Sequence, residues 1–510
     1  MSKRPIIFGL LLIATVISII IVQLLQPTSA QQQPCVSNPT SQIINPAPFN
    51  WTYVSSPEPH YLGVLEYGQA TFNINNQTLT TRAYRQQGGC YSIPGPTLKM
   101  VPGNKYILRF HNLLPYQAPN PQHNVFKDPN ITNVHTHGLH ISGESPGDDV
   151  TRIFEGGFGG DYVYNIPANH MGGTFWYHAH HHGSSFLQVS SGAFGMIVID
   201  DSGDQIPANV AAMEEREILL GYLDRGVAGT GGDTLVSGTL PAGWTVNGTV
   251  NGNLTVPPNT WQHWRVLLAD RDATPKNVIV GANCEVKLLA RDGVLRTSAP
   301  KNLPTSTVNL TGASRADLAV RCSANSNIKV GTTTVANILV SGTTNLGPNP
   351  YAADGVSMWS AVRPNYLRDL RNETVVNTET VNMGARTVNG SKFDINTPTF
   401  TLTANAVQEW NIKGATQHPF HLHVYHFQPQ SSNCGGDFEV GEYYDTLAGS
   451  CAVRFDLNAA TSSPYEGRTI MHCHILEHED QGAMAWMDVI GGSPPPTFPS
   501  GLGYSAYYPL

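Results

Sequence analysis

Three segments of the chain repeat one plan of two alternating strands joined by a short polar turn, and this repeat limits the folds that the sequence can adopt. They are PTLKMVPGNKYILRFHNLL (96–114), GNLTVPPNTWQHWRVLLAD (252–270) and PTFTLTANAVQEWNIKG (398–414). Period-2 alternation is typical of half-buried strands. Its return at intervals of about 150 residues predicts repeated β-sandwich domains.

The length of 510 residues agrees with this repeat, because about 150 residues per domain gives roughly three domains. Charged residues make up only 13% of the chain, whereas Gly (49) and Pro (36) are plentiful. This composition favours short strands and turns over helices. We place the domains at 50–202, 212–348 and 355–492, followed by a Pro/Gly-rich extended tail at 493–510.

The first thirty residues form a targeting segment, in which Lys3 and Arg4 precede an unbroken apolar run. Residues 1–30 are either a signal peptide cleaved after Ala30 or an uncleaved signal anchor, and an anchor would leave residues 6–25 as a membrane tether. Both interpretations predict a secreted chain or one on the extracellular face of a membrane. The net charge of −8 gives no basic patch, so we expect no nucleic-acid partner.

Two further features suit an oxidising compartment. Seven cysteines are an odd number, and six of them can pair as neighbours along the chain, which leaves Cys473 unpaired. The predicted pairs are Cys35–Cys90, Cys284–Cys322 and Cys434–Cys451. Sequons predict a glycosylated surface, and they lie at Asn50, Asn76, Asn130, Asn247, Asn253, Asn309, Asn372 and Asn389.

Twelve of the 19 histidines lie in four short motifs, HTHG, WYHAHHHG, HPFHLH and HCHILEH, and ten of the twelve are candidate ligands. Residues i and i+2 of a strand point to the same face, so each His-X-His pair presents two imidazoles to one side. Neutral imidazole is the commonest metal ligand in proteins. The four pairs therefore predict a metal cluster rather than isolated core histidines.

Cys473 lies between two of these histidines, and its side chain points to the opposite face of the strand. Its thiolate can bind one metal centre while His472 and His474 bind a second, with only a few covalent bonds between the centres. A cysteine with two histidines is the trigonal set of a blue-copper centre, whereas structural zinc usually takes more cysteines.

These motifs, in this order and over about residues 55–490, resemble the multicopper oxidases, a family that includes laccases, bilirubin oxidases and ferroxidases. The resemblance implies an all-β fold of three consecutive cupredoxin-like Greek-key β-sandwich domains. It also implies four copper ions: one type 1, one type 2 and two type 3. Such an enzyme takes single electrons from a phenolic, aromatic amine, pigment or metal-ion donor at the type 1 copper, and it reduces dioxygen to water at a trinuclear cluster.

Matched position by position, the resemblance places the type 1 copper on His418, Cys473 and His478. The type 2 copper takes His135 and His421. The type 3 pair takes His137, His178 and His474 on one ion and His180, His423 and His472 on the other, although spacing alone leaves open which ion each of these histidines serves. His181 and His182 fall outside the pattern and are expected to form hydrogen bonds or to face solvent.

Related enzymes place two acids near the cluster to deliver protons. The matching residues here are Asp148, with Asp149 as the neighbouring alternative, and Glu479, which adjoins the ligand His478. We predict Asp148 and Glu479 as the catalytic acids.

The chain departs from the family at two places. The axial position, ten residues after Cys473, is often Met or Leu and is here Ala483; Met484 would point to the opposite strand face unless a bulge turned it inward. Without an axial thioether, the potential of the blue copper should be high. Val424 and Tyr425 follow HLH where laccases commonly have Gly-His, which weakens the transfer of laccase substrate specificity.

Two other functions stay open at this point. A copper nitrite reductase would need only two cupredoxin domains and no His-Cys-His bridge to a type 3 pair. A non-catalytic copper-binding or copper-storing protein would lack cluster ligands, whereas all ten ligand histidines are present. Only ten Met and no Met-rich insertion argue against a dedicated Cu(I) oxidase.

Overall fold

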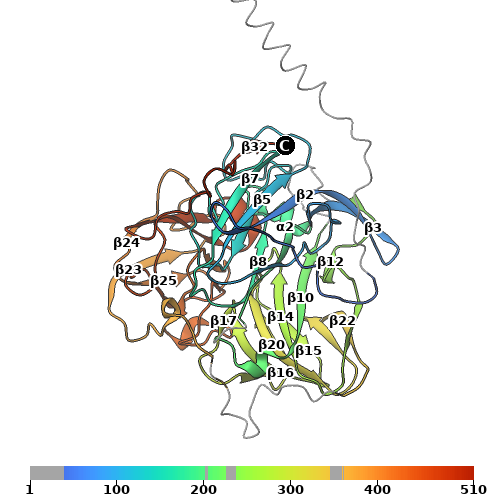
Figure 1. Ribbon diagram of the computed structural model, residues 1–510. Coiled ribbons are helices and arrows are strands. Elements are labelled where there is room, and N and C mark those ends of the chain that lie inside the picture. Colours follow the sequence, from blue (N-terminus) through green and yellow to red (C-terminus); the bar gives the residue numbers. More distant parts are fainter. Residues whose placement is uncertain (1–39, 202–204, 225–236, 345–358, 360) are drawn as a thin grey trace, which may run out of the picture. The chain divides into compact units, whose positions relative to one another are not determined.

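The computed structural model describes residues 40–201, 205–224, 237–344, 359 and 361–510. Strands dominate these residues, which confirms the predicted all-β class (Figure 1). The described helices are short: α2 (Ser185–Ser190), α3 (Ala208–Ala211), α4 (Leu476–Asp480), η1 (Asn365–Leu367) and η2 (Ser432–Cys434). None of the helices in this part of the chain is long and apolar enough to cross a membrane. The targeting segment 1–30 lies outside the described residues.

The first group of strands runs mostly through residues 52–199 and forms two sheets. The larger sheet has, in hydrogen-bonded order, β11 (Ser237–Gly238), β3 (Gln77–Gln86), β2 (His60–Ile74), β5 (Lys105–Asn112), β7 (Phe158–Asn165) and β32 (Tyr508–Pro509), with β1 (Thr52–Val54) paired to β2. The smaller sheet has β4 (Leu98–Met100), β9 (Phe194–Ile199), β8 (Gly173–His178) and β6 (His135–His137).

The second group runs through residues 214–340 and also forms two sheets. One has β12 (Gly243–Val246), β10 (Glu214–Leu223), β14 (Gln262–Ala269), β20 (Arg315–Cys322), β16 (Cys284–Arg291) and β17 (Val294–Leu295), with β18 (Lys301–Asn302) paired to β16. The other has β13 (Gly252–Val256), β22 (Thr333–Val340), β21 (Ser326–Val330), β15 (Lys276–Val280) and β19 (Thr307–Leu310).

The third group runs through residues 375–490. One sheet has β23 (Val375–Asn382), β25 (Val407–Lys413), β29 (Ala452–Asp456) and β27 (Gln428–Pro429). The other has β24 (Phe400–Thr403), β31 (Met484–Ile490), β30 (Gly467–Cys473), β26 (Phe420–Leu422) and β28 (Thr446–Leu447). The three groups follow one another along the chain, and the domain boundaries given above stay a prediction.

One hydrophobic core is shared by all three groups of strands. β14 is buried along its whole length because its two faces serve two cores. Trp264 and Val266 face the core of the second group, whereas Leu267 packs in a core with Trp176 of the first group and Leu476 of the third. Burying such a side chain contributes about 1.5–3 kcal/mol. This shared core stabilises the contact between the strands that carry the histidine motifs.

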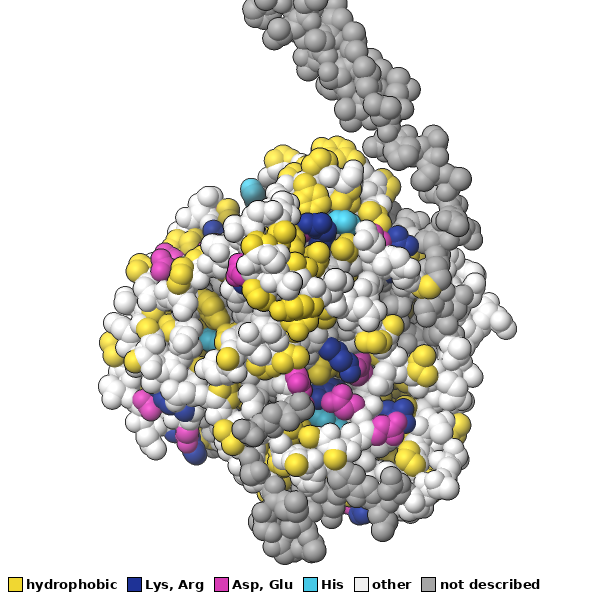
Figure 2. Space-filling model, in the orientation of Figure 1, with side chains coloured by type: hydrophobic (Ala, Val, Ile, Leu, Met, Phe, Trp, Pro, Cys, Tyr) yellow, Lys and Arg dark blue, Asp and Glu magenta, His cyan; other side chains and the backbone are white. Residues whose placement is uncertain are grey.

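The C-terminal segment, expected as an extended tail, returns to the first group. β32 extends the larger sheet by antiparallel pairing with β7. The hydroxyl of Tyr504 lies 2.6 Å from His60 Nε2, and the backbone N–H of Ser505 donates to Asp161 Oδ2 at 3.0 Å. Hydrophobic side chains gather on the surface over β7 and β32 (Figure 2), where Leu510 stays exposed.

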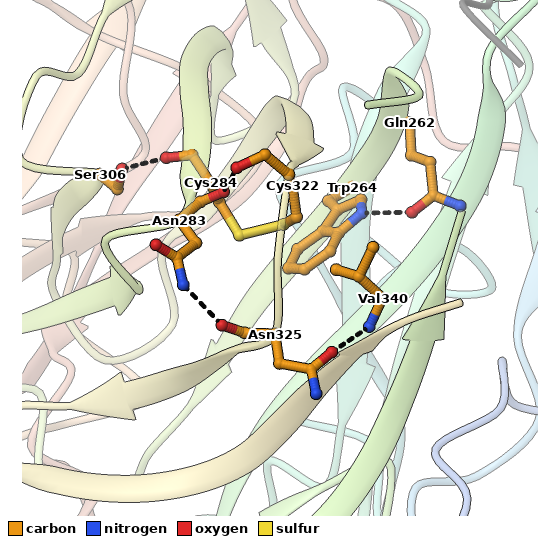
Figure 3. The surroundings of a disulfide bond; sticks show 9 residues. Gln262, Trp264, Asn283, Cys284, Ser306, Cys322, Asn325 and Val340 are labelled. Atoms are coloured by element: carbon orange, nitrogen blue, oxygen red, sulfur yellow. Dashed lines mark hydrogen bonds between the residues drawn. A yellow bond between two sulfur atoms is a disulfide. The ribbon is translucent and has the colours of Figure 1, made fainter. Parts of the chain in front are cut away.

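Two of the three predicted disulfides, Cys284–Cys322 and Cys434–Cys451, are present, and Cys473 is a buried free thiol. The predicted partner of Cys90, Cys35, lies outside the described residues. The Cys284–Cys322 bond joins the neighbouring strands β16 and β20 in the core that contains Trp264 (Figure 3). Beside it, the Ser306 hydroxyl donates to the carbonyl oxygen of Cys284 at 2.7 Å.

Removing this disulfide should destabilise the second group of strands without touching the histidine motifs. The bond closes a loop with a sequence separation of 38. Replacing both Cys284 and Cys322 with Ser should therefore lower the free energy of unfolding by about 2–4 kcal/mol, because the unfolded chain regains freedom. Urea unfolding followed by tryptophan fluorescence measures this. The control is Ser306→Ala, which removes only a hydrogen bond and should cost about 1 kcal/mol. An unchanged unfolding midpoint in the double variant would contradict the prediction.

Candidate metal centre

The four His-X-His motifs meet at one buried place. β6 pairs with β8, so that His135 lies opposite His178. β26 pairs with β30, so that His421 lies opposite His472. The structure brings together eight buried imidazoles, those of His135, His137, His178, His180, His421, His423, His472 and His474.

Histidines of the first and third strand groups face each other in two stacked pairs. The ring centroids of His135 and His423 lie 3.9 Å apart, and those of His137 and His421 lie 3.8 Å apart. Short separations of this kind let one ion bind imidazoles from both groups. Sets whose ligand atoms all lie within 4.8 Å of one another include His180–His423–His472, His135–His421–His423 and His135–His137–His178.

Most of these imidazoles keep one nitrogen without a hydrogen-bond partner. His135 donates Nδ1–H to Asp148 at 2.7 Å and His421 donates Nδ1–H to the carbonyl oxygen of Asp445 at 2.7 Å, and in both rings Nε2 is left unpaired. A buried unpaired polar atom costs about 1–3 kcal/mol, and a metal ion accepts its lone pair. The residues therefore fit a metal cluster. Unpaired ring nitrogens occur in His135, His137, His178, His180, His421, His423 and His474.

The cluster histidines are neutral. Burial lowers the pKa of His135, His180 and His474 well below the usual value, and it lowers the pKa of His421 to about 4. Neutral imidazoles carry the free lone pair that a metal ion needs.

A second donor set lies on the other face of β30. His418 Nδ1 is 3.2 Å from His478 Nδ1, which is 3.7 Å from Cys473 Sγ. Cys473 is fully buried, whereas both histidines are half-buried. Burial raises the pKa of the Cys473 thiol to about 12, so a thiolate there requires a bound cation. The structure thus brings together the three residues of a trigonal blue-copper set.

Ala483 lies on the same side as Cys473. Both pack in the same core, and the backbone N–H of Cys473 donates to the carbonyl oxygen of Ala483 at 2.9 Å. Met484 pairs with His472 across β30 and β31 and packs in a different hydrophobic cluster, with Trp486. The prediction that Met484 points away from Cys473 is confirmed.

Of the two acids predicted near the first motif, Asp148 is the one that contacts the cluster. Its Oδ2 accepts from His135 Nδ1 at 2.7 Å, and its Oδ1 accepts from the backbone N–H of Thr136 at 2.8 Å. Burial raises the pKa of Asp148 well above its usual value. Asp149 instead accepts from the backbone N–H and the hydroxyl of Thr151. Asp148 therefore orients a cluster imidazole, and Asp149 does not.

Glu479 follows His478 on α4 and is fully buried. Its Oε1 lies 3.2 Å from His182 Nδ1 and 4.0 Å from His180 Nδ1, and its Oε2 has no partner. Burial raises the pKa of Glu479 to about 8. The carboxyl group therefore holds a proton near neutral pH, beside a cluster imidazole.

His181 and His182 form hydrogen bonds, as predicted. His181 Nε2 lies 3.3 Å from Asp128 Oδ2, and His182 Nε2 lies 3.0 Å from Asn124 Oδ1. His182 is the more informative of the two because its other nitrogen contacts Glu479.

Asp480, whose role the sequence does not predict, fixes α4 against the second histidine motif. Its carboxylate accepts backbone N–H groups at the start of α2, from Gly183 at 2.6 Å, Ser185 at 3.1 Å and Phe186 at 2.9 Å. An oxygen at this place satisfies N–H groups that the helix leaves free. The signal for this role was an acid next to Glu479, but its partners lie in a distant segment.

Comparison with known proteins agrees with this geometry. Two family models, each described as multicopper oxidase, match residues 91–204 and 367–492, which contain every predicted ligand. A multicopper oxidase of Staphylococcus haemolyticus is 26% identical over 417 residues, which cover 78% of this chain and 82% of that protein. A laccase of Bacillus subtilis is 24% identical over 510 residues and covers 82% of this chain and 93% of its own length.

Solved structures share the fold. A laccase from Pediococcus acidilactici aligns with a TM-score of 0.67 at 19% identity, over 91% of this chain and 97% of that one. A metallo-oxidase from Campylobacter jejuni aligns with a TM-score of 0.64 at 18% identity, over 90% of this chain and 98% of that one. The likeness confirms cupredoxin-like domains. The chain belongs to the multicopper oxidase family. It is a copper-dependent oxidoreductase whose partners are dioxygen and an electron donor.

The buried carboxyl group of Glu479 should make the copper-free protein less stable at alkaline pH. Its folded-state pKa of about 8 exceeds its ordinary value of 4.5, so the folded state holds an extra proton between these values. The stability that this carboxyl group contributes therefore falls as pH rises from 4.5 to about 8. Relative to wild type, the free energy of unfolding of Glu479→Gln should rise by up to about 1.4 kcal/mol per pH unit.

Urea unfolding of the copper-free proteins between pH 5 and about 9 measures this difference. Glu477→Gln, the same change at a half-buried position of α4, serves as the control for the loss of one carboxylate. A difference between Glu479→Gln and wild type that stays flat across the range would contradict a protonated Glu479.

Proposed function

We propose that this chain is a four-copper oxidase that takes single electrons at His418, Cys473 and His478 and reduces dioxygen to water at a three-copper cluster held by the eight buried histidines. Bound copper supplies one-electron storage at the first place and four-electron dioxygen chemistry at the second. The protein supplies the ligands, their orientation, the path between the two places and the protons.

The position of Cys473 carries this proposal. Its thiol lies with His418 and His478 on one face of β30, while the neighbouring His472 and His474 point into the cluster. An electron that leaves the thiolate therefore reaches a cluster ligand through the bonds of one backbone step. A protein that only stored copper would have no need to join the two places in this way.

His418 marks the place where electrons arrive. Its imidazole and that of His478 are half-buried, whereas Cys473 is closed off from solvent. A donor at the surface can therefore contact a ligand ring without entering the protein. We propose a phenol, an aromatic amine, a pigment or a metal ion as the donor.

In this proposal the cluster ligands are divided among the copper ions by the family pattern. We propose that His135 and His421 hold the type 2 copper, and the type 3 pair takes the other six histidines. The compact set of His180, His423 and His472 supports one type 3 ion. Rings of different sets also face each other, since His135 stacks on His423 and His137 on His421. Close stacking across the sets favours a cluster whose ions act together.

Two carboxyl groups serve the cluster in this proposal, one as a proton source and one as a partner of a ligand. Glu479 holds a proton near neutral pH and lies beside His180 and His182. Its position suits delivery of that proton to the cluster, and His182, which contacts Asn124, is the more exposed of its two histidine neighbours. Asp148 fixes the tautomer of His135 and keeps Nε2 free for a metal ion.

We also propose that the protein is exported and glycosylated. The disulfides Cys284–Cys322 and Cys434–Cys451 support an oxidising compartment. The sequons agree with this location. The choice between a cleaved signal peptide and a membrane tether depends on residues outside the described part of the chain.

The purified protein should be blue and should consume oxygen with a phenolic donor. Cys473→Ser should abolish the blue colour, because charge transfer from the thiolate to copper is its source. Oxygen uptake should fall with the colour, while most of the copper in the cluster remains. Absorption spectra, copper per chain and oxygen uptake measure these three effects.

The control for this experiment is His181→Gln. His181 lies in the HAHHH run together with the predicted ligands His178 and His180, but its side chain bonds to Asp128 rather than to the cluster. This variant should keep both the colour and the oxygen uptake. A blue Cys473→Ser protein, or a wild type that binds copper without consuming oxygen, would contradict the proposed function.

Ala483→Met should lower the reduction potential of the blue copper. A thioether at the axial position adds electron density and stabilises Cu(II) relative to Cu(I). The control is Met484→Leu, which should leave the potential near the wild-type value because Met484 packs away from Cys473. Redox titration of the blue absorption measures both. A potential that rises in Met484→Leu and does not fall in Ala483→Met would instead assign the axial position to Met484.

A further inference from the structure

A buried ion pair connects the second group of strands to the metal cluster. Arg315, the first residue of β20, forms two parallel hydrogen bonds with Asp445, which immediately precedes β28. Arg315 Nη1 lies 3.0 Å from Asp445 Oδ1, and Nη2 lies 2.6 Å from Oδ2. The two side chains are 0% and 1% exposed. A pair this deeply buried is stable only if its remaining polar atoms also have partners.

Arg315 meets this condition because all five of its N–H donors are used. Two go to Asp445, and the other three donate to the backbone carbonyl oxygens of Thr174 at 3.2 Å, Ala313 at 3.2 Å and Asp292 at 3.1 Å. A planar fork with five donors is specific to arginine. The guanidinium group is therefore held in one orientation, and it holds Asp445 in turn.

Asp445 contacts two of the cluster histidines. Its Oδ1 accepts from His137 Nε2 at 3.1 Å, and its backbone carbonyl oxygen accepts from His421 Nδ1 at 2.7 Å. The opposite nitrogens, His137 Nδ1 and His421 Nε2, are the unpaired ones. Asp445 thus determines which nitrogen of each ring is free, in the two rings that stack 3.8 Å apart.

Gly138, the last residue of HTHG, leaves space for this pair. Its φ is +92°, and an added Cβ would lie 2.5 Å from Arg315 Nη2 and 2.7 Å from Asp445 Oδ2. The first histidine motif and the ion pair therefore fit together only with glycine at this position.

We propose that Arg315 is a positioning residue for the copper cluster. It acts through Asp445 to hold His137 and His421 in the tautomers that bind metal, and the second group of strands, which carries no predicted ligand, affects the cluster in this way. This proposal rests on the proposed function. A wild-type protein that bound no copper would contradict that function itself, so copper loading of the wild type is measured first.

The test compares Arg315→Lys with Arg265→Lys. Lysine keeps the positive charge of Arg315 but cannot form two parallel hydrogen bonds with Asp445. Arg265 is an equally buried arginine on β14 of the same strand group, and within the described part of the chain its partners Asp201, Glu215 and Asp317 form no hydrogen bond or ion pair with the eight histidines. The readouts are copper retained after dialysis against a chelator, blue absorption per chain and melting temperature.

Arg315→Lys should bind cluster copper roughly 10–100-fold more weakly than wild type, a usual effect of losing a partner of a metal-binding histidine. It should keep its blue absorption, because His418, Cys473 and His478 do not contact the pair. Arg265→Lys should keep both kinds of copper even if it melts at a lower temperature. Arg315→Gln, which is planar but uncharged, is the second variant and should also lose cluster copper.

Three results would overturn the proposal. The first is wild-type retention of cluster copper by Arg315→Lys. The second is a parallel loss of blue absorption and cluster copper, which indicates general unfolding. The third is failure of both Arg315 variants to fold while Arg265→Lys folds, since Arg315 would then be a folding determinant rather than a positioning residue.

Discussion

The burial of eight imidazoles at one place is the constraint on which the rest of the structure depends. Each unpaired nitrogen in a dry interior costs about 1–3 kcal/mol, and seven of the eight rings carry at least one. In the copper-free protein, the residues packed around the imidazoles keep them in place. The shared core that contains Trp176 and Leu267 fixes the strands, and Asp148 fixes a ring. Copper that binds only the folded state removes the penalty and adds stability.

Much of the site could be predicted from the sequence because its information is local. Strand geometry alone places residues i and i+2 on one face, so HTH and HCH predicted pairs of imidazoles without any knowledge of the fold. The free thiol of Cys473 followed from counting cysteines. Alternation also indicated the β class. The same alternation correctly predicted that Ala483 lies on the side of Cys473 and that Met484 faces the other way.

The parts that could not be predicted depend on contacts between distant segments. Arg315, Asp445 and Asp480 are ordinary charged residues in the sequence, and their roles appear only when three groups of strands meet. The short strands β11 and β32 have no alternation that marks them, because pairing with an existing sheet edge makes them strands. Asp148 and Asp149 are neighbours with equal chemistry, and only their hydrogen bonds distinguish them.

The placement of ligands along the chain has a consequence for the order of assembly. The three ligands of the proposed blue site belong to one group of strands: His418, Cys473 and His478. This site therefore needs only segments that lie close together near the C-terminal end of the chain. The cluster needs β6 and β8 as well as β26 and β30, with the entire second group of strands between them. Contacts between such distant segments are slow to form, because the entropy of closing a long loop opposes them. The blue site can therefore become complete while the cluster is still in halves, and metal in the cluster reports that folding has finished.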